Sequence, residues 1–200
     1  MKDGNGIFGK NSAKQGEAPA IALINPKNKH NVGKVVRSAS CFGIKQVWWT
    51  GDRVQMGGEK RLPREERMKG WQDVSYRQYD RFLDQFNSDV VPVCIELRPD
   101  AVPLPMFEHP EKALYIFGPE DGHVDSIWAR HCQRFVVIPT RYCLNLAVAV
   151  SLVLYDRQTK MEPNLTIHDT ISDNDKRHWN QGGQGGDAND DFFEELGLTS

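Results

Sequence analysis

The chain has 200 residues, of which 39% are hydrophobic and 26% charged, and its formal net charge is −2. This length fits one domain with extensions, and the composition is ordinary for a soluble globular protein. No stretch approaches the roughly 20 apolar residues that a membrane span needs, and residues 1–16 lack the apolar core of a signal peptide. We therefore expect a cytoplasmic protein that does not span a membrane.

The charge is unevenly distributed along the chain. Residues 1–160 hold 23 Lys/Arg and 18 Asp/Glu, whereas residues 161–200 hold 2 Lys/Arg and 9 Asp/Glu. A mildly basic body is compatible with a polyanionic partner, although a solvated surface explains the same balance equally well.

The thiols and imidazoles show no pattern of metal ligands. The four cysteines lack Cys-x-x-Cys spacing and lie in or beside apolar runs, which favours buried thiols over disulfides or a zinc site. The histidines also lack ligand spacing, so we expect no metal. The residues in question are Cys41, Cys94, Cys132 and Cys143, with His30 and His123 as the histidines nearest the motifs described below.

The first elements in chain order are a strand and a helix. Residues 20–24 are apolar and are followed by Asn25-Pro26, which predicts a strand. Residues 32–42 place apolar side chains at helical spacing, with Asn31 as a candidate N-cap and Gly43 as the helix end.

The same alternation continues through the next hundred residues. It predicts strands at 46–50, 90–95, 114–117 and 135–138, and helices at 81–86, 124–132 and 144–155. Strands alternating with helices indicate an α/β domain with a mainly parallel sheet. Because the strands are continuously apolar, both faces of the sheet should be covered.

The two ends of the chain differ in character from this domain. Residues 1–17 and 161–200 are polar and rich in Gly, Asn and charged residues, and we expect both to be flexible, around a domain at 18–160. Residues 192–198, Phe-Phe-Glu-Glu-Leu-Gly-Leu, are the apolar exception, and are either a docking segment or the tail end.

Three short segments carry the functional signal. The first holds Asn31, Gly33, Arg37 and Ala39; the second is Gly118-Pro119-Glu120-Asp121-Gly122; the third is Ile138-Pro139, followed by Cys143-Leu144-Asn145. In this order and spacing they resemble the three motifs of the SpoU (TrmH-like) branch of the SPOUT RNA methyltransferases, over about residues 18–160.

The resemblance implies a fold and an activity. The fold is an α/β domain with a C-terminal trefoil knot. The activity is transfer of a methyl group from S-adenosylmethionine to a ribose 2′-hydroxyl of tRNA or rRNA, by a homodimer whose sites are shared between the two chains. Three features depart from the family: the second motif reaches Gly122 one position early, Cys143 stands where Ser is usual, and the loop before Cys143 is short.

The resemblance also implies which residues form the site. Cofactor contacts fall on Gly118, Ile138 and Leu144, with Glu96 or Leu97 at the end of an earlier strand, and catalytic roles fall on Arg37, Asn31, Glu120 and Asn145. An arginine is a poor base because its pKa exceeds about 12, so Arg37 is better suited to supporting the developing alkoxide. The plainer alternatives are a surface arginine for Arg37, a carboxylate at a helix N-terminus for Glu120 and an N-cap for Asn145.

A basic stretch follows the second predicted strand. Its cations include Arg53, Arg61, Arg64 and Lys69, with Trp71 beside them, which suits contact with an RNA backbone and base stacking. The interspersed glutamates fit a solvated loop just as well.

Three rival functions stay open. A knotted dimer that binds RNA without methylating it is supported by Cys143 and the short loop. A base-directed SPOUT enzyme is disfavoured by Arg37, and an ordinary nucleotide-binding enzyme lacks a Gly-x-Gly-x-x-Gly sequence or a P-loop.

Overall fold

The structure, a computed structural model, describes residues 16–55, 62 and 70–165. The chain divides into two units, Met1–Met161 and Glu162–Ser200, and every element below belongs to the first. Within the described ranges, no helix has both the length and the apolar character needed to cross a membrane. The predicted boundaries at 18 and 160 and the flexible ends stay predictions.

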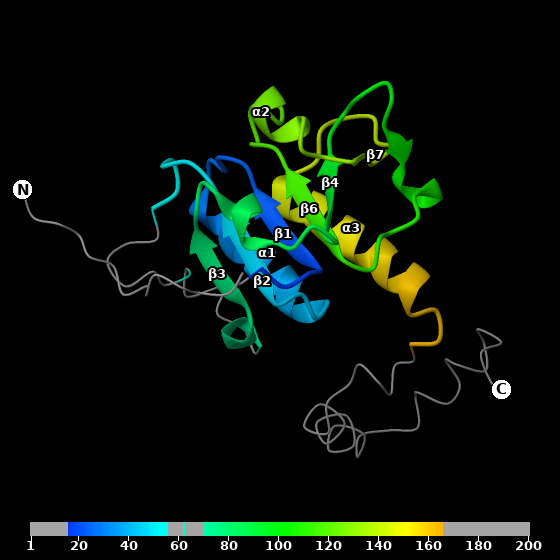
Figure 1. Cartoon of the computed structure of the whole chain (residues 1–200), viewed down its shortest axis with the longest axis horizontal. Helices are drawn as coiled ribbons and strands as arrows, with labels where there is room; N and C mark the ends of the chain where they lie inside the picture. The colour runs from blue at the N-terminus through cyan, green and yellow to red at the C-terminus, as the bar shows by residue number, and fades with distance from the viewer. Residues whose placement is uncertain (1–15, 56–61, 63–69, 166–200) are drawn as a thin grey trace, which may run out of the picture. The chain divides into compact units, whose positions relative to one another are not determined.

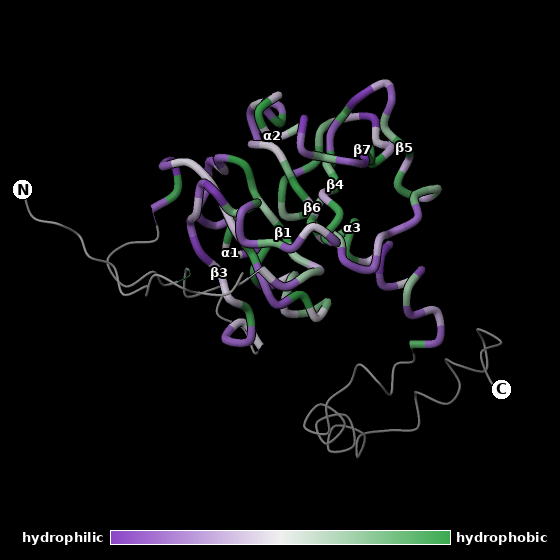
Figure 2. Tube along the Cα trace, viewed as in Figure 1, coloured by the Kyte–Doolittle hydropathy of each residue, from purple (hydrophilic) through white to green (hydrophobic). Residues whose placement is uncertain are grey.

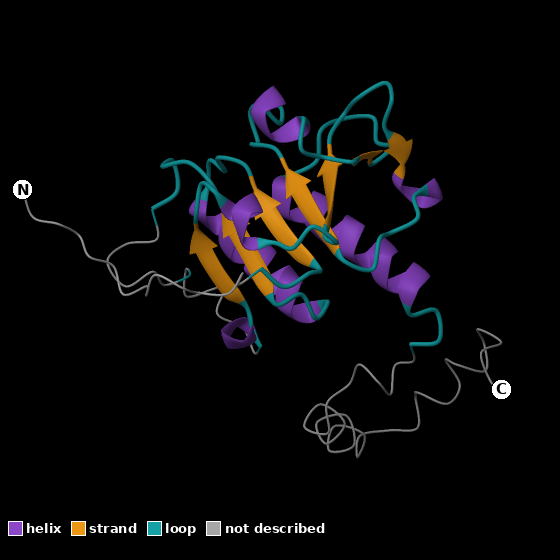
Figure 3. Ribbon diagram, viewed as in Figure 1, coloured by secondary structure: helices purple, strands orange, loops and turns teal. Residues whose placement is uncertain are grey.

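A seven-stranded parallel sheet forms the centre of this unit (Figure 1). Its strands are β1 (Ala20–Leu23), β2 (Gln46–Trp49), β3 (Ser75–Gln78), β4 (Val91–Ile95), β5 (Val102–Pro103), β6 (Ala113–Phe117) and β7 (Arg134–Val137). The order across the sheet is β3-β2-β1-β6-β4-β7-β5. Because every pairing is parallel, the carboxyl ends of the strands lie at one edge (Figure 3).

Helices of unequal length connect the strands. The α-helices are α1 (Lys29–Cys41), α2 (Ser126–Ala129) and α3 (Leu146–Met161), and the 3-10 turns are η2 (Trp71–Asp73), η3 (Phe82–Gln85) and η4 (Leu104–Met106). The predicted α/β architecture with a mainly parallel sheet is confirmed. The trefoil knot stays a prediction.

The two faces of the sheet are covered by different elements. Successive side chains of a strand point to opposite faces. In β1, Ile21 and Leu23 pack into a cluster with α1 and α3, whereas Ala20 and Ala22 pack into a second cluster with Phe82 of η3 and, at its edge, Trp128 of α2. All four β1 residues are buried, which explains the continuously apolar sequence (Figure 2).

The start of α1 differs from the prediction. Asn31 was expected to cap the helix, but the N-cap is Asn28, whose side chain accepts a hydrogen bond from the backbone of His30. Asn31 lies inside the helix, and its amide is engaged in a contact with a distant segment, described below. The end of the helix is as expected, since Gly43 follows it with a φ of 69°.

Other differences concern short or polar elements. β3 was missed because its residues are mostly polar and partly exposed, as is usual for an edge strand. The helix predicted at 81–86 is the shorter turn η3, and that predicted at 124–132 is the four-residue α2. α3 begins two residues later than predicted and continues to Met161.

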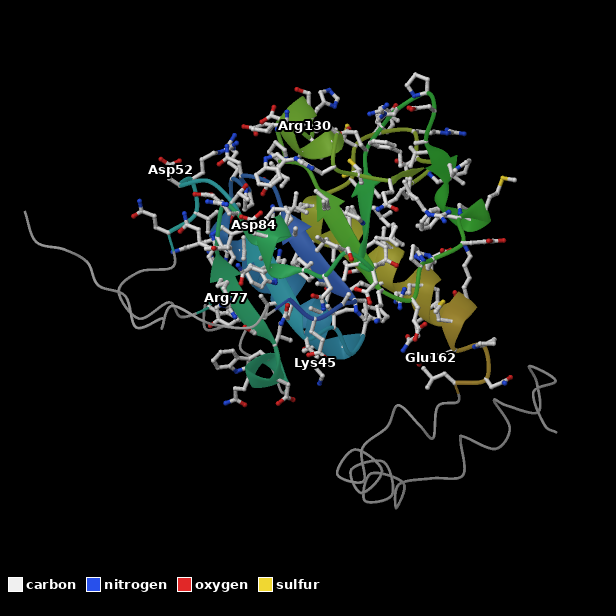
Figure 4. All side chains as sticks on the ribbon, in the orientation of Figure 1. Lys45, Asp52, Arg77, Asp84, Arg130 and Glu162 are labelled. Atoms are coloured by element: carbon white, nitrogen blue, oxygen red, sulfur yellow. The ribbon has the colours of Figure 1, made fainter. Side chains whose placement is uncertain are left out.

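Figure 4 identifies the two edges of the sheet by labelled side chains. Lys45 precedes β2 and Asp52 follows it, so these residues mark the amino and carboxyl edges respectively. The segments that follow β1, β6 and β7 all lie at the carboxyl edge, and they contain the three sequence motifs.

Candidate active site

Three hydrogen-bonded side chains, Glu120, Asn31 and Asn145, connect the three motifs and are called the polar chain below. The Asn31 amide nitrogen donates to Oε1 of Glu120 at 2.7 Å, and the Asn145 amide nitrogen donates to the Asn31 oxygen at 3.1 Å. Asn31 comes from the first turn of α1, Glu120 follows β6, and Asn145 precedes α3. The sequence placed all three in one site, and the structure brings them together.

The direction of these hydrogen bonds follows from the chemistry of a carboxylate. An ionised carboxylate can only accept, so Asn31 presents its NH₂ group to Glu120 and leaves its carbonyl oxygen for Asn145. Asn145 then donates with its NH₂ group, and its own oxygen accepts from the backbone of Ala147 at 2.9 Å. One charged group therefore orients two amides and the start of α3.

Glu120 also holds the segment that follows β1. Its Oε2 accepts from the backbone N–H of Lys27 at 2.7 Å, and its Oε1 from that of Asn28 at 3.3 Å. Burial alone raises the pKa of this carboxyl, but the hydrogen bonds from Asn31, Lys27 and Asn28 outweigh it and hold the pKa below its usual value. Glu120 is therefore ionised at neutral pH.

Asn145 has two tasks in this arrangement. Its side-chain contact with Ala147 caps α3, as the plainer interpretation of the sequence expected, and its amide fixes Asn31. A second contact between the same two helices joins the hydroxyls of Ser38 and Ser151 at 2.9 Å. The packing of α1 on α3 thus supports the geometry of the site.

Arg37 lies apart from this chain. It is exposed on α1, and its side chain has no hydrogen bond or ion pair with any residue that the structure describes. Six residues separate it from Asn31, which turns it about 120° around the helix axis. Within one chain, the structure does not bring Arg37 to Glu120 or Asn145.

A cavity of about 420 Å³ opens beside Glu120, at the carboxyl ends of β4, β6 and β7. All five residues predicted to contact a cofactor line it, namely Glu96, Leu97, Gly118, Ile138 and Leu144. The sequence reasoning missed other lining residues, among them Phe117, Thr140, Arg141, Tyr142 and Ala149. Their neighbours in the same loops were the available signal.

The backbone at Gly118 passes close to the loop at Val124. A Cβ at this position would lie 3.1 Å from the backbone nitrogen of Val124 and 3.2 Å from its Cγ2. The sequence indicated that glycine is needed here for close approach. The structure shows that one partner in this approach is the protein's own loop.

Glu96 fastens that loop to β4. Its carboxylate accepts from the backbone of Leu97 at 2.9 Å and of Val124 at 2.8 Å, and contacts His123 Nδ1 at 3.0 Å. The hydrogen bond to Glu96 raises the pKa of the exposed His123. Glu96 therefore lines the cavity, and both of its carboxylate oxygens already have contacts within the protein.

The predicted RNA-binding cations are only partly within the described residues. Arg53 makes three short contacts of 2.9–3.0 Å with the Asp121 carboxylate, so its guanidinium is neutralised within the chain. Arg53 also lines a second cavity of about 430 Å³, together with Lys27 and Lys29. Arg61, Arg64 and Lys69 lie outside the described ranges.

Among the four cysteines, only Cys143 lines the cavity. All four cysteines are free, and the exposed Cys143 lines the cavity next to Leu144. Across the described part of the chain, no group of three or more His, Cys, Asp or Glu side chains could hold a metal ion.

The fold and the position of the site are those of an open, parallel α/β protein that binds a ligand. The chain order runs outward from β1 to β3 and then crosses to the other half of the sheet, so the strand order reverses between β1 and β6. Asn31 follows β1 and Glu120 follows β6, which places the polar chain at this reversal. Open parallel α/β proteins bind their ligands at such a point.

The family follows from the sequence match. A model of the SpoU rRNA Methylase family matches residues 18–155. The protein therefore belongs to this family, as the three motifs indicated. No curated protein sequence matches the chain.

Solved structures share the fold. One, described as giving structural insights into the 2-OH methylation of C/U34 on tRNA, is 24% identical, with a TM-score of 0.62 over 72% of this chain and 97% of that one. The A. aeolicus TrmH/SpoU tRNA modifying enzyme is 20% identical, with a TM-score of 0.63 over 79% and 86%.

A third structure contains a ligand. The SpoU methyltransferase AviRb from Streptomyces viridochromogenes, in complex with the cofactor AdoMet, is 18% identical, with a TM-score of 0.61. The match covers 72% of this chain but 58% of AviRb. At these identities the likeness establishes the fold.

Proposed function

We propose that the protein is an S-adenosylmethionine-dependent RNA methyltransferase that modifies a ribose 2′-hydroxyl, in tRNA first and in rRNA as the second candidate. The observation that supports this most directly is the Glu120–Asn31–Asn145 chain beside the 420 Å³ cavity. Membership of the SpoU rRNA Methylase family supports RNA methylation in general.

The cavity suits S-adenosylmethionine in size and lining. Its volume lies in the range of about 300–1,000 Å³ that is usual for small-molecule sites. Apolar side chains of Ile138, Leu144 and Leu146 offer a surface for a purine, and the Thr140 hydroxyl oxygen, whose proton is donated to the Tyr142 carbonyl, can still accept a hydrogen bond. When bound, the cofactor would supply an activated methyl group from its sulfonium.

Glu120 acts in this proposal as a positioning residue and not as a base. A general base works best when its pKa lies near the operating pH. The carboxylate of Glu120 already accepts from three N–H groups, which hold its pKa low. Its task is to orient Asn31, and through Asn31 the start of α3.

Arg37 is the residue that we expect to act on the RNA. Its permanent charge can bind the phosphate beside the target ribose and stabilise the developing alkoxide. Its side chain is exposed and does not line the cavity of its own chain. We infer that it serves the cavity of a partner chain in a homodimer.

The outer face of α3 supports association of two copies. Val148, Leu152 and Tyr155 are exposed by 47%, 39% and 59%, and their spacing places them along one side of the helix. Large apolar side chains in a row are typical of an interface. A second copy of this chain could bury them and bring its Arg37 to the first chain.

The choice of tRNA rests on likeness alone. Two of the structural relatives are described in connection with tRNA, one of them for methylation at C/U34. A cytoplasmic location is part of this proposal, since it follows from the proposed tRNA substrate.

The first experiment is calorimetric titration of the purified protein with S-adenosylmethionine. We expect saturable binding that Gly118→Trp abolishes, because the new side chain would be directed at the backbone of Val124 and would displace the loop beside the cavity. Incubation with unfractionated tRNA and then with ribosomal RNA, followed by mass spectrometry of the nucleosides, would identify a 2′-O-methyl product. Methylation of a base instead would contradict the ribose assignment.

One observation supports a second candidate, an RNA-binding module without methyl transfer. Cys143 lines the cavity, and its thiol is a weaker hydrogen-bond donor than the hydroxyl usual at this position in the family. A module of this kind would bind tRNA but not S-adenosylmethionine. If the parent protein does not bind S-adenosylmethionine and Cys143→Ser restores that binding, the result would favour this candidate.

A further inference from the structure

The loop between β7 and α3 presents an unusual aromatic side chain. Tyr142 is exposed by 85%, more than any other large hydrophobic residue that the structure describes. The loop itself is held, since the Thr140 hydroxyl donates to the Tyr142 carbonyl at 2.8 Å. The ring therefore projects from a fastened backbone.

Nothing in the described part of the chain packs on this ring. Tyr142 makes no ring contact, and its hydroxyl has no partner among those residues. Removing a tyrosine ring from water is favourable, and because this ring also lines the cavity, a ligand bound there can cover it.

The position of Tyr142 points to the kind of ligand. It lines the 420 Å³ cavity, and Asn145 of the polar chain is three residues further along. Leu97, exposed by 71%, lines the same cavity from the loop that follows β4, the neighbour of β7 in the sheet. Tyr142 thus lies at the proposed cofactor cavity and close in the chain to Asn145.

The chemistry of the neighbouring residue favours RNA over a protein partner. Arg141 is exposed and lines the cavity, and its guanidinium has no partner among the described residues. An aromatic ring beside a free cation is a common surface for a nucleotide, since the ring stacks on the base and the cation contacts the phosphate.

From this geometry we propose that Tyr142 stacks on the base of the nucleotide whose ribose is modified, with Arg141 on an adjacent phosphate. This inference rests on the proposed function and deepens it, because it names the group that selects an unpaired, accessible nucleotide. A base inside a duplex would first have to be unstacked, so the inference favours a target in a loop or at an end.

The test compares four variants of the full chain: Tyr142→Ala, Tyr142→Phe, Tyr142→Leu and Met106→Ala. Met106 is the control, because it is also exposed, by 76%, but does not line the cavity. The measurements are the Kd for unfractionated tRNA by filter binding, the KM and kcat for its methylation, the Kd for S-adenosylmethionine, and the association state by sedimentation.

We expect Tyr142→Ala and Tyr142→Leu to raise the Kd and KM for tRNA on the order of tenfold, as is typical for loss of one stacked base. Tyr142→Phe, which keeps the ring, and Met106→Ala should match the parent protein. The Kd for S-adenosylmethionine and the association state should not change.

Three results would overturn the inference. Unchanged tRNA binding in Tyr142→Ala would show that the ring does not contact RNA. Weaker S-adenosylmethionine binding would assign the ring to the cofactor, and a change in association state would assign it to a second copy of the chain. If the parent protein binds tRNA but methylates nothing, the proposed activity fails while the binding comparison still tests Tyr142.

Discussion

The amide nitrogen of Asn31 lies 2.7 Å from Oε1 of Glu120, although 89 residues separate them in the chain. This contact joins the start of α1 to the end of β6. Because the Glu120 carboxylate can only accept, it determines the orientation of Asn31 and then that of Asn145. The orientation of the two amides therefore depends on the negative charge of Glu120 as well as on the shape of its side chain.

Glu120→Gln should disrupt the site while changing its volume little. Glutamine places an NH₂ group where three N–H donors now converge, and we expect the catalytic rate to fall and the fold to lose roughly 1–3 kcal/mol of stability. Methylation assays and urea denaturation would measure both, with the exposed Glu108→Gln as the control.

Glu120→Gln should also change how the stability of the fold depends on pH. The folded protein holds the pKa of Glu120 below its usual value, so this stabilisation is present above the unfolded pKa of about 4.5 and is lost as the pH falls through the folded pKa. Glu120→Gln should lose part of this acid sensitivity. An identical pH dependence in the two proteins would contradict the assignment.

Gly118→Ala should weaken cofactor binding without unfolding the protein. Its Cβ would lie 3.1 Å from a backbone nitrogen of the loop at Val124, so the loop must move. Overpacking of this kind costs about 1–3 kcal/mol, which corresponds to a loss of about 5- to 150-fold in affinity if the strain falls on the bound state.

Gly122→Ala is the matched control for this change. Gly122 lines the same cavity, but its Cβ would meet only the Pro119 side chain, at an ordinary 3.4 Å. Calorimetry should show near-parent affinity for Gly122→Ala. Equal losses in both variants would mean that glycine as such, and not the Val124 contact, matters at these positions.

Arg37→Ala should abolish most activity and leave stability within about 0.5 kcal/mol, since Arg37 is exposed and has no partner in the described residues. Loss of a group that stabilises charge at a reacting centre costs about 100-fold or more. The Kd for S-adenosylmethionine should not change, which separates this variant from Gly118→Trp.

Mixing these two inactive variants tests the shared site. In a mixed dimer, the Arg37→Ala chain keeps its cavity and the Gly118→Trp chain keeps its arginine. If Arg37 acts across the interface, this combination has one complete site and activity returns on mixing. Mixtures that stay inactive, under conditions in which the chains exchange, would place Arg37 in its own chain's site.

A buried cluster away from the site should make stability depend on pH. His109 is buried, with Nδ1 2.7 Å from the Tyr115 hydroxyl and Nε2 2.8 Å from Asp156, which Lys160 also contacts at 2.7 Å. Burial lowers the pKa of His109, although Asp156 opposes this, while Lys160 and Arg157 act in the same direction as burial.

The sign follows from proton binding. With its pKa lowered in the folded state, His109 binds fewer protons there than in the unfolded chain, so stability falls as the pH drops below about 6.5. Urea unfolding between about pH 8 and about pH 5.5 should show this loss, and His109→Gln should flatten it. A slope that survives the substitution would assign the effect to other groups.

Local patterns predicted the sheet well because the signal is local. The buried run at residues 20–23 reads as a strand whatever surrounds it, and the same is true of β2, β4 and β6. The edge strand β3 has no such run, because its side chains are exposed or partly exposed and need not be apolar. The sequence reasoning therefore missed it.

The N-cap of α1 shows where local reasoning fails. Asn28 and Asn31 are the same residue type, and both positions are compatible with a cap. The choice between them is made by Glu120, which binds the Asn31 side chain and leaves Asn28 to accept from His30. No local pattern reports a partner 89 residues away.

The amino-acid sequence by itself determined the family, the strands and helices between the two edges of the sheet, and five of the residues that line the cavity, because these depend on short patterns and their spacing. Only the tertiary structure decided which amide binds Glu120, that Glu96 and Arg53 already have partners, and that Arg37 does not line its own chain's cavity. Those outcomes depend on side chains that meet across the sheet, where distance along the chain carries no information.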